Sequence, residues 1–273
     1  MPLAYYSVSA DRDFWADHWG GHSTRELLET ARHSPLTALI SRALPRDGVV
    51  LEAGCGLGQY VVLLRERGWR AAGVDWAVDA LRTCRQLAPV PLAAMKLEAL
   101  AIRDASLSAY VSLGVVEHDE GGPDGILAEA ARVLKSGGVA IVSVPYLNGV
   151  RTIGRPWLAR RSRALARRGA TFYQYAFTRG ELVAALARHG FVTLDAHPYD
   201  PARLLRRFVR PAAGRRPANE AGTPGRGGAG APDRGEAREP GRGSLGGAAR
   251  RVLYTEPMLR LLGHMLLAVA RKH

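Results

Sequence analysis

Short apolar runs alternate with amphipathic stretches along most of this chain from Val49 onward. The runs have the length of β-strands, and the stretches between them carry apolar residues at helical spacing. We predict strands over Val49–Glu52, Arg70–Asp75, Val90–Ala94, Ala109–Leu113, Val139–Val144, Phe191–His197 and His264–Ala270. We predict helices over Gln59–Arg67, Ala77–Leu87, Asp124–Leu134 and Arg179–Arg188. This alternation indicates an α/β fold with a doubly wound, seven-stranded, mostly parallel sheet and helices on both faces.

Several helix ends carry signals of their own. Ser23-Thr-Arg-Glu26 and Thr178-Arg-Gly-Glu181 have the spacing of capping boxes, in which side chains satisfy N–H groups at the helix start. Ser34-Pro35 predicts a further helix, with serine as the N-cap and proline in the first position. Glycines follow three predicted helices where left-handed backbone is favoured: Gly68, Gly137 and Gly190. Residues 1–48 are therefore expected to form helices that pack on the core.

Two segments interrupt the alternation. Tyr146–Tyr175 is rich in arginine and aromatic residues, and we expect it to form a lid on a core domain that spans residues 49–200. Pro211–Ala249 consists mainly of Gly, Ala, Pro and Arg, so it cannot bury enough apolar surface to offset its chain entropy. We expect it to be disordered, either as a tolerated surface loop or as a functional tether.

The remaining organisation follows from these two segments. Arg203–Arg210 interleaves arginine with leucine, phenylalanine and valine, which predicts a short basic amphipathic helix. This helix and the disordered insertion make up residues 201–250. Residues 251–273 are expected to hold a terminal helix and the last strand of the core.

A glycine-rich loop directly follows the first strand of the core. Gly54, Gly56 and Gly58 alternate with other residues, so the third glycine comes one position too early for a dinucleotide fingerprint. The loop also lacks the Gly-Lys-Ser/Thr ending of a P-loop. Glu52 would repel a pyrophosphate but suits a positive amino group, and Asp75 ends the second strand where it can accept both hydroxyls of a ribose. A ribose with a cationic end and no phosphate describes S-adenosylmethionine.

Four segments then carry a family resemblance: Leu51-Glu-Ala-Gly-Cys-Gly-Leu-Gly58, Gly73-Val-Asp-Trp76, Val111-Ser-Leu-Gly-Val-Val-Glu-His118 and Ala131-Arg-Val-Leu-Lys-Ser-Gly-Gly138. The chain resembles class I S-adenosylmethionine-dependent methyltransferases of the small-molecule type, which includes the ubiquinone-biosynthesis O-methyltransferases. The resemblance covers roughly Val49 to Pro198 and implies a Rossmann-like fold. It also implies an enzyme that uses S-adenosyl-L-methionine to methylate a small-molecule, lipid-linked or glycan acceptor, with oxygen as the acceptor atom by analogy.

The resemblance implies a set of cofactor-binding residues at the ends of the first, second and fourth strands: Glu52, Gly54, Cys55, Gly56, Gly58, Asp75, Trp76 and Leu113. The alternative for Asp75 is a structural role as a cap for the following helix, and both roles can coexist. Trp76 either lies along the adenine or packs under that helix. Cys55 is expected to be a small packed side chain rather than a nucleophile.

Two positions depart from the family pattern. Lys96 occupies the slot where an acid usually reaches the adenine amino group, and a lysine cannot accept that hydrogen bond. Glu98 is close enough in sequence to substitute. Ser108 replaces an aspartate that often opens the fourth strand. These departures motivate an alternative, a catalytically impaired binding protein that keeps the methyltransferase fold.

His118 ends the fourth-strand segment, facing the expected position of the transferred methyl group. A histidine can remove the proton of an oxygen acceptor, because its unperturbed pKa lies near roughly 6.5. The alternative is that Glu117 and His118 only brace the turn. No metal site is expected, because Glu117, His118 and Asp119 are consecutive and point in different directions.

Charge is distributed unevenly along the chain. The net charge is +13, but residues 1–150 hold 14 Lys/Arg and 17 Asp/Glu, a net of −3. The excess positive charge therefore lies in the second half, which argues against a nucleic-acid methyltransferase as the alternative function of the cofactor domain. The arginines of the lid and of Arg203–Arg210 could instead contact anionic lipid or an acidic substrate, or form a solvated face.

Cysteine content and hydropathy favour a cytoplasmic location, and peripheral contact with a membrane is the alternative that the arginine-rich segments leave open. Cys55 and Cys84 are the only cysteines, and their positions favour reduced thiols over a disulfide. We find no N-terminal apolar stretch after a basic start, and no apolar run long enough for a membrane span.

Overall fold

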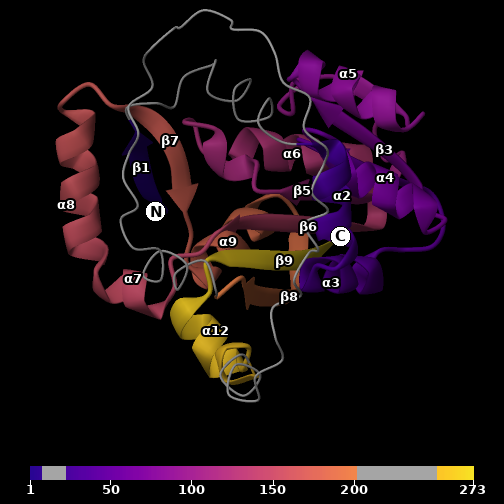
Figure 1. Ribbon diagram of the computed structural model, residues 1–273. Helices are drawn as coiled ribbons and strands as arrows, with labels where there is room; N and C mark the ends of the chain where they lie inside the picture. Colours follow the sequence, from indigo (N-terminus) through magenta and orange to yellow (C-terminus); the bar gives the residue numbers. More distant parts are fainter. Residues whose placement is uncertain (8–22, 202–250) are drawn as a thin grey trace, which may run out of the picture.

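A seven-stranded sheet forms the centre of the computed structural model, which describes residues 1–7, 23–201 and 251–273 (Figure 1). Its strand order is β4-β3-β2-β5-β6-β9-β8. The strands are β2 (Val49–Ala53), β3 (Arg70–Asp75), β4 (Leu92–Ala94), β5 (Leu107–Leu113), β6 (Leu134–Pro145), β8 (Phe191–Tyr199) and β9 (Met265–Lys272). Neighbouring strands from β4 to β6 pair in parallel, and β9 is antiparallel to both β6 and β8. The prediction of a mostly parallel, seven-stranded sheet is confirmed.

Helices cover both faces of this sheet, as predicted. One face packs against α2 (Thr24–Arg32), α3 (Pro35–Ala43), α4 (Gln59–Glu66) and α5 (Val78–Leu87). The other face packs against α6 (Asp124–Val133) and α9 (Arg179–Arg188). The sheet positions that face these helices are almost all fully buried valine, leucine, isoleucine and alanine, because parallel strands have no solvent-exposed face.

The predicted helix ends are confirmed in part. Thr178 and Glu181 form a complete capping box at α9, and the Ser34 side chain accepts the N–H of Leu36 at α3. The capping box predicted at Ser23 is wrong, because this exposed serine makes no side-chain hydrogen bond to the start of α2. Water can satisfy the end of an exposed helix instead.

The prediction for Gly137 is also wrong. Gly68 and Gly190 follow α4 and α9 with left-handed backbone, as expected. Gly137 has a φ of 75° but lies inside β6, because α6 has already ended at Val133. Its left-handed backbone falls where the β5–β6 register shifts, between the Leu107–Leu134 and Ala109–Val139 pairs.

A second, two-stranded sheet was not expected from the sequence. It pairs β1 (Leu3–Ser7) with β7 (Thr171–Ala176) in antiparallel register. The prediction that residues 1–48 form only helices is therefore wrong at β1. The partner of β1 lies far away in the sequence, so no local pattern could reveal the pairing.

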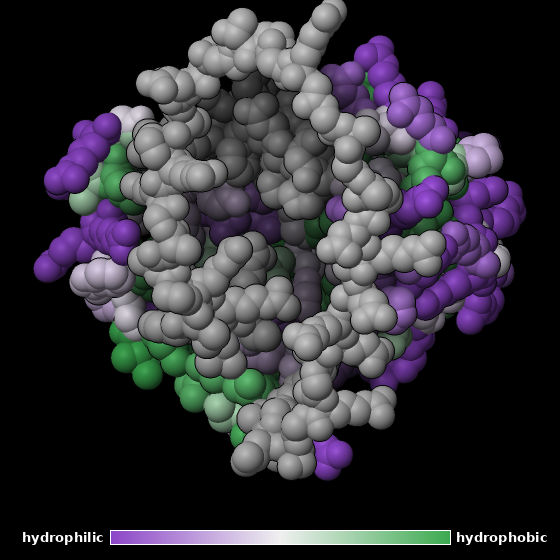
Figure 2. All heavy atoms as spheres, in the orientation of Figure 1, coloured by the Kyte–Doolittle hydropathy of each residue, from purple (hydrophilic) through white to green (hydrophobic). Residues whose placement is uncertain are grey.

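The segment Tyr146–Tyr175 contributes two helices that precede β7 and lie next to this small sheet. It forms α7 (Gly149–Ile153) and α8 (Arg155–Ala166) before β7, and α8 lies along β1 in Figure 1. In the space-filling view of Figure 2, hydrophobic residues gather at the lower left, over α7 and α12 (Glu256–Leu262). Among the helices of the described residues, none has the length and apolar character that a membrane span requires.

Two predictions fall outside the described residues. These are the basic helix over Arg203–Arg210 and the disordered insertion over Pro211–Ala249, which belong to residues 202–250. The strands on either side of this region, β8 and β9, are antiparallel neighbours, as expected for the last pair of the sheet.

Candidate functional site

A cavity of about 510 Å³ lies at the carboxyl ends of the parallel strands. The chain leaves β2 toward β3 on one side and later returns as β5 on the other, so the strand order reverses at the β2–β5 pair. Such a reversal leaves a crevice at the sheet edge. The residues that line the cavity are Glu52, Gly54, Cys55, Gln59, Asp75, Trp76, Leu97, Leu113, Gly114, Val115, Glu117, His118, Pro145, Tyr173, Gln174, His264 and Met265.

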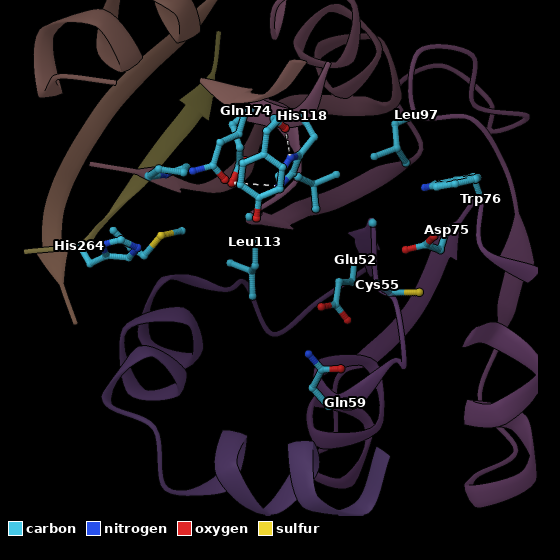
Figure 3. A pocket seen from close by; sticks show the side chains of 17 residues that line it. Glu52, Cys55, Gln59, Asp75, Trp76, Leu97, Leu113, His118, Gln174 and His264 are labelled. Carbon is cyan, nitrogen blue, oxygen red and sulfur yellow. Dashed lines mark hydrogen bonds and ion pairs between the residues drawn. The ribbon is translucent and has the colours of Figure 1, made fainter. Parts of the chain in front are cut away.

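The cavity has two chemically different ends. Figure 3 shows Glu52, Cys55, Asp75, Trp76 and Leu97 at one end, which β2, β3 and the loop after β4 supply. His118, Gln174 and His264 lie toward the other end, with Leu113 between the two groups. Seven of the nine residues predicted from the sequence therefore line one cavity; Gly56 and Gly58 do not.

The glycine loop is held by close packing as well as by its backbone conformation. Gly54 has a φ of 78°, and a Cβ there would lie 2.5 Å from a methyl group of Val115. Gly58 has a φ of 67° at the N-cap of α4, and a Cβ there would lie 2.5 Å from Sγ of Cys84. Only glycine fits both positions without displacement. Gly58 thus permits the turn into α4 behind the cavity.

Asp75 connects the second strand to the glycine loop. Its Oδ2 accepts the N–H of Gly56 at 2.7 Å, and its Oδ1 accepts the N–H of Ala77 at 2.8 Å. Ala77 is the N-cap residue of α5, so Asp75 organises both turns that border the cavity. Burial raises the pKa of the Asp75 carboxyl, and these backbone hydrogen bonds act in the opposite direction. Each oxygen still has a lone pair for another donor.

Glu52 is buried beside the glycine loop. Its Oε2 has no hydrogen-bond partner among the described residues, and the same is true of Oε1 of Gln59, which also lines the cavity. Burial is the main cause that raises the pKa of Glu52 to about 8; the Val61 N–H acts in the opposite direction, and the nearby Asp75 carboxylate adds a smaller upward effect. A buried carboxyl with an unsatisfied oxygen favours a ligand that brings a cationic donor, because such a donor binds the ionised form.

Both cysteines are buried thiols with no disulfide. Burial raises the pKa of Cys55 far above its ordinary value, and it raises the pKa of Cys84 to about 11. Neither thiol is therefore a thiolate nucleophile at neutral pH. Cys55 and Cys84 pack against the first strands and the glycine loop, in agreement with the prediction for Cys55.

The wall after β4 differs from the sequence prediction. Lys96 is exposed and does not line the cavity, whereas its neighbour Leu97 does. Ser108 is buried against Gly48 and does not line the cavity either. Trp76 lines the cavity with 47% of its surface exposed, so it does not pack under α5. Neither Lys96 nor Ser108 therefore contributes to the cavity wall, which is apolar here and consists of Leu97 and Trp76.

His118 has a defined tautomer. It lies in a short 3₁₀ turn (Val116–His118) after β5, and its Nδ1 lies 2.7 Å from the backbone oxygen of Tyr173 in β7. A carbonyl oxygen only accepts hydrogen bonds, so Nδ1 carries the proton. In the neutral ring, Nε2 is therefore the basic nitrogen. The Tyr173 ring also packs against the imidazole, with 5.3 Å between ring centroids.

Glu117 is the second buried carboxyl of the cavity. It is 1% exposed, and its Oε2 lacks a partner among the described residues. Burial raises its pKa to about 8. Its Oε1 is 3.9 Å from Nε2 of His118, too long for a hydrogen bond. Near neutral pH this carboxyl is mostly protonated, so it differs from the acceptor-only carboxylate of Asp75.

His264 lines the cavity opposite the glycine loop with the reverse tautomer. The guanidinium of Arg151 has no acceptor, and its Nη2 donates to Nδ1 of His264 at 2.8 Å. The proton of His264 is therefore on Nε2. Arg151 is fixed by a second hydrogen bond to the backbone oxygen of Tyr146. The site thus combines a basic Nε2 on His118 with a donor Nε2–H on His264.

Only a small part of the arginine- and aromatic-rich segment Tyr146–Tyr175 lines the cavity. Tyr173 and Gln174 of β7 line it, whereas Trp157 is 61% exposed on α8 and Tyr146 is buried below the lining. Phe172 packs instead against Tyr6 of β1, with ring centroids 6.0 Å apart. These aromatics hold the small sheet together, and that sheet carries Tyr173 to His118.

Sequence reasoning did not single out Gln59, His264 and Met265. Gln59 directly follows the glycine loop and could have been found from that position. His264 and Met265 reach the site only because β9 inserts beside β6, and no local signal marks that insertion.

Residues 51–142 match a family described as Methyltransferase domain. This match covers β2 to β6, which are the strands that supply most of the cavity. Residues 51–142 carry a methyltransferase domain. The family resemblance seen in the four sequence segments is therefore confirmed, while the closer similarity to ubiquinone-biosynthesis enzymes stays a prediction.

Two curated relatives share this domain with the chain. A Mus musculus tRNA (carboxymethyluridine(34)-5-O)-methyltransferase is 30% identical over 123 residues, which cover 43% of this chain and 18% of the relative. A Mycolicibacterium smegmatis protein, named as an S-adenosylmethionine-dependent methyltransferase, is 36% identical over 110 residues, which cover 39% of this chain and 41% of the relative. The chain thus spans less than half of the length of either relative.

A solved structure extends the similarity in fold. The crystal structure of an S-adenosylmethionine-dependent methyltransferase from Mesorhizobium loti matches with a TM-score of 0.56 at 17% identity, over 89% of this chain and 100% of that chain. At this identity the match establishes the Rossmann-like fold of the methyltransferase domain.

Proposed function

We propose that this chain is an S-adenosylmethionine-dependent methyltransferase that acts on an oxygen atom of a small-molecule, lipid-linked or glycan acceptor. The observation that carries the proposal is the pair of buried carboxyls, Glu52 and Asp75, at the tips of two neighbouring parallel strands. They line one end of a cavity whose other end holds a histidine with a basic Nε2.

The residues at the first end fit the cofactor. Asp75 is fixed by the N–H groups of Gly56 and Ala77, and its remaining lone pairs can accept two ribose hydroxyls. Oε2 of Glu52 has no partner among the described residues, and an ammonium group would satisfy it. A Cβ at position 54 would collide with Val115, so at Gly54 the wall of the cavity consists of backbone. Trp76 and Leu97 supply flat and apolar surface for a base.

Bound S-adenosylmethionine would supply a methyl group on a positively charged sulfur. The part of this chain is to hold the donor and the acceptor in line, because alignment provides most of the acceleration in such a displacement. Leu113 lies between the two ends of the cavity and would exclude water from the space between the reactants.

His118 would act as the base for an oxygen acceptor. Its Nδ1–H is held by the backbone oxygen of Tyr173, so Nε2 is the nitrogen that takes the proton. His264 would be a positioning residue, because its Nε2–H can donate to a second polar atom of the acceptor. Arg151 keeps His264 in that tautomer.

Isothermal titration calorimetry with S-adenosylmethionine tests the cofactor assignment. We expect saturable 1:1 binding and competition by S-adenosylhomocysteine; the absence of both would overturn the proposal. Metabolite profiling of a deletion strain then tests the reaction, with accumulation of a compound lighter by one methyl group as the expected result. Cofactor binding without any methylated product would identify the alternative, an impaired binding protein.

One relative favours a second candidate, an RNA acceptor. The mouse protein similar to this chain is named as a tRNA methyltransferase, but the match covers only 43% of this chain. Transfer of a radioactive methyl group to total tRNA, compared with transfer to a lipid extract and to a small-molecule extract, separates the two candidates. Incorporation into tRNA alone would replace the first proposal by the second.

A further inference from the structure

The α7–α8 corner of the molecule exposes an unusual amount of apolar surface. Val150 is 45% exposed, Ile153 is 83% exposed and Trp157 is 61% exposed. Leu261 of α12, which is 40% exposed, joins them, because its Cδ1 lies 3.0 Å from the position that a Cβ on Gly149 would take. We call Val150, Ile153, Trp157 and Leu261 the apolar tip. Figure 2 shows hydrophobic residues gathered in this region, over α7 and α12.

The α8 helix packs one side against β1 and exposes a side that carries tryptophan and arginine. Its inner side packs on β1, where Leu158 and Ala159 join a small cluster with Leu3, and Ser162 Oγ donates to the backbone oxygen of Ala4 at 2.6 Å. The outer side carries Trp157, Arg160 and Arg161, which share one face at spacings of three and four residues. The Arg161 guanidinium lies 5.6 Å from the centroid of the Trp157 ring.

The arginines next to the apolar tip have no nearby acid in the sequence. No aspartate or glutamate occurs between Glu129 and Glu181. Arg151 and Arg155 are engaged inside the protein, with His264 and Glu181 respectively. The exposed arginines on and just after α8 are Arg160, Arg161, Arg163, Arg167 and Arg168. We call these five residues the arginine belt.

We propose that the apolar tip and the arginine belt form a docking surface for an anionic phospholipid membrane. Proteins that insert shallowly into a charged bilayer combine an apolar tip with an aromatic residue at its boundary and a belt of basic residues next to it. Tryptophan prefers the interface itself, since its ring is apolar and its N–H needs a polar partner. A second copy of this chain fits the surface poorly, because it would bring two arginine belts together.

The helices that carry the docking surface are connected along the chain to the wall of the cavity. α8 leads into β7, which supplies Tyr173 and Gln174 to the cavity wall, and α12 leads into His264 and Met265. The elements that carry the docking surface are therefore directly connected to segments of this wall. The proposal itself does not depend on methyl transfer.

Vesicle co-sedimentation of the full chain tests the proposal. We expect binding to vesicles of phosphatidylcholine with phosphatidylglycerol, a decrease at high salt, and little binding to pure phosphatidylcholine. Equal binding to both kinds of vesicle would overturn it.

Two surface variants separate the tip from the belt. Ile153→Ser with Trp157→Ser, and Arg160→Gln with Arg161→Gln and Arg168→Gln, should each weaken partitioning by roughly tenfold or more. Matched controls are Val192→Ser with Leu194→Ser on β8, and Arg25→Gln with Arg42→Gln and Arg82→Gln, all of which are exposed elsewhere. The controls should bind like the wild type. Equal losses in variants and controls would show general charge or hydrophobicity rather than this surface, and would overturn the proposal.

Fluorescence provides a local readout. Brominated lipid in anionic vesicles should quench part of the emission of the wild-type protein, and Trp157→Phe should remove most of that quenching. Unchanged quenching in Trp157→Phe would overturn the insertion of the tip. If Ile153→Ser with Trp157→Ser instead converts a dimer to a monomer without lipid, the tip is an interface between copies and the proposal fails.

Discussion

The backbone N–H of Gly56 donates to Oδ2 of Asp75 at 2.7 Å. This single contact connects the glycine loop after β2 to the acid that ends β3. It fixes the carboxylate in the cavity before any ligand is present. The two motifs that first suggested a cofactor site are therefore parts of one structural unit.

Asp75→Asn should weaken S-adenosylmethionine binding by roughly tenfold or more, because one ribose hydroxyl would lose its charged acceptor. Calorimetry measures the change, and thermal unfolding checks that the turn into α5 survives. Asp79→Asn on the exposed side of α5 is the matched control and should bind normally. Equal affinities for Asp75→Asn and the wild type would remove Asp75 from the binding site.

Glu52→Gln should weaken cofactor binding in a pH-dependent manner. Glu52 has a pKa of about 8 before ligand binding, so it is mostly neutral at pH 6 and ionised above pH 8. A cationic amino group selects the ionised form, so the variant-to-wild-type ratio of dissociation constants should rise with pH and reach roughly tenfold or more above pH 8. Titration of the ligand amino group is common to both proteins and cancels in this ratio.

A ligand without the amino acid tail provides the control for Glu52. Binding of 5′-methylthioadenosine, which keeps the ribose and the base, should be unaffected by Glu52→Gln and weakened by Asp75→Asn. Loss of this ligand in Glu52→Gln would mean that Glu52 acts on the fold of the loop and not on the amino group.

Glu117→Gln should stabilise the protein at high pH. The folded-state pKa of Glu117 is raised from 4.5 to about 8, so between these values the folded protein binds more protons than the unfolded chain. The free energy of unfolding of the wild type therefore falls as pH rises through this window. The variant lacks this titration, so its advantage should grow by about 1 kcal/mol or more from pH 5 to pH 9. Urea denaturation at both pH values measures it, and exposed Glu120→Gln should show no such growth.

Gly58→Ala should destabilise the fold by roughly 1–3 kcal/mol, since alanine is strained at a φ of 67° and its Cβ would collide with Cys84 Sγ. Denaturant unfolding measures this loss. Gly180→Ala in α9, where a Cβ meets nothing within 4 Å, should be neutral or slightly stabilising. Adding Cys84→Ala to Gly58→Ala should recover part of the loss; full additivity of the two changes would refute the proposed collision.

His118→Asn should lower kcat by about 10²-fold or more with little change in cofactor affinity. The asparagine amide can still donate to the Tyr173 oxygen, so the turn keeps its support while the basic Nε2 is lost. A methylation assay on the acceptor found by metabolite profiling gives the rate. A drop of less than threefold would assign His118 a bracing role only.

The sequence predicted those parts of the structure that local patterns determine. The strands β2 to β6 and β8 and the helices α4, α5, α6 and α9 follow from apolar runs, and their predicted bounds differ from the structure by a few residues at most ends, whereas α7, α8 and β7 were not predicted. Glu52, Asp75 and Leu113 were found because each occurs at the tip of such a strand. The wall of His264 and Met265 was missed, since it depends on the pairing of β9 with β6, two segments far apart in the chain. Long-range pairing also explains the missed strand at Leu3–Ser7.

The central position of β9 has a consequence for biosynthesis. Within the described part of the chain, β8 occupies the sheet edge and pairs only with β9, which the ribosome makes after residues 200–264. Until then, β6 lacks a neighbour on that side and exposes the edge of a nearly finished sheet, which is a hazard for aggregation. We therefore expect the nascent chain to become able to bind its ligands only late in synthesis. This happens when Met265 to Lys272 insert as β9 between β6 and β8, which the ribosome has already made.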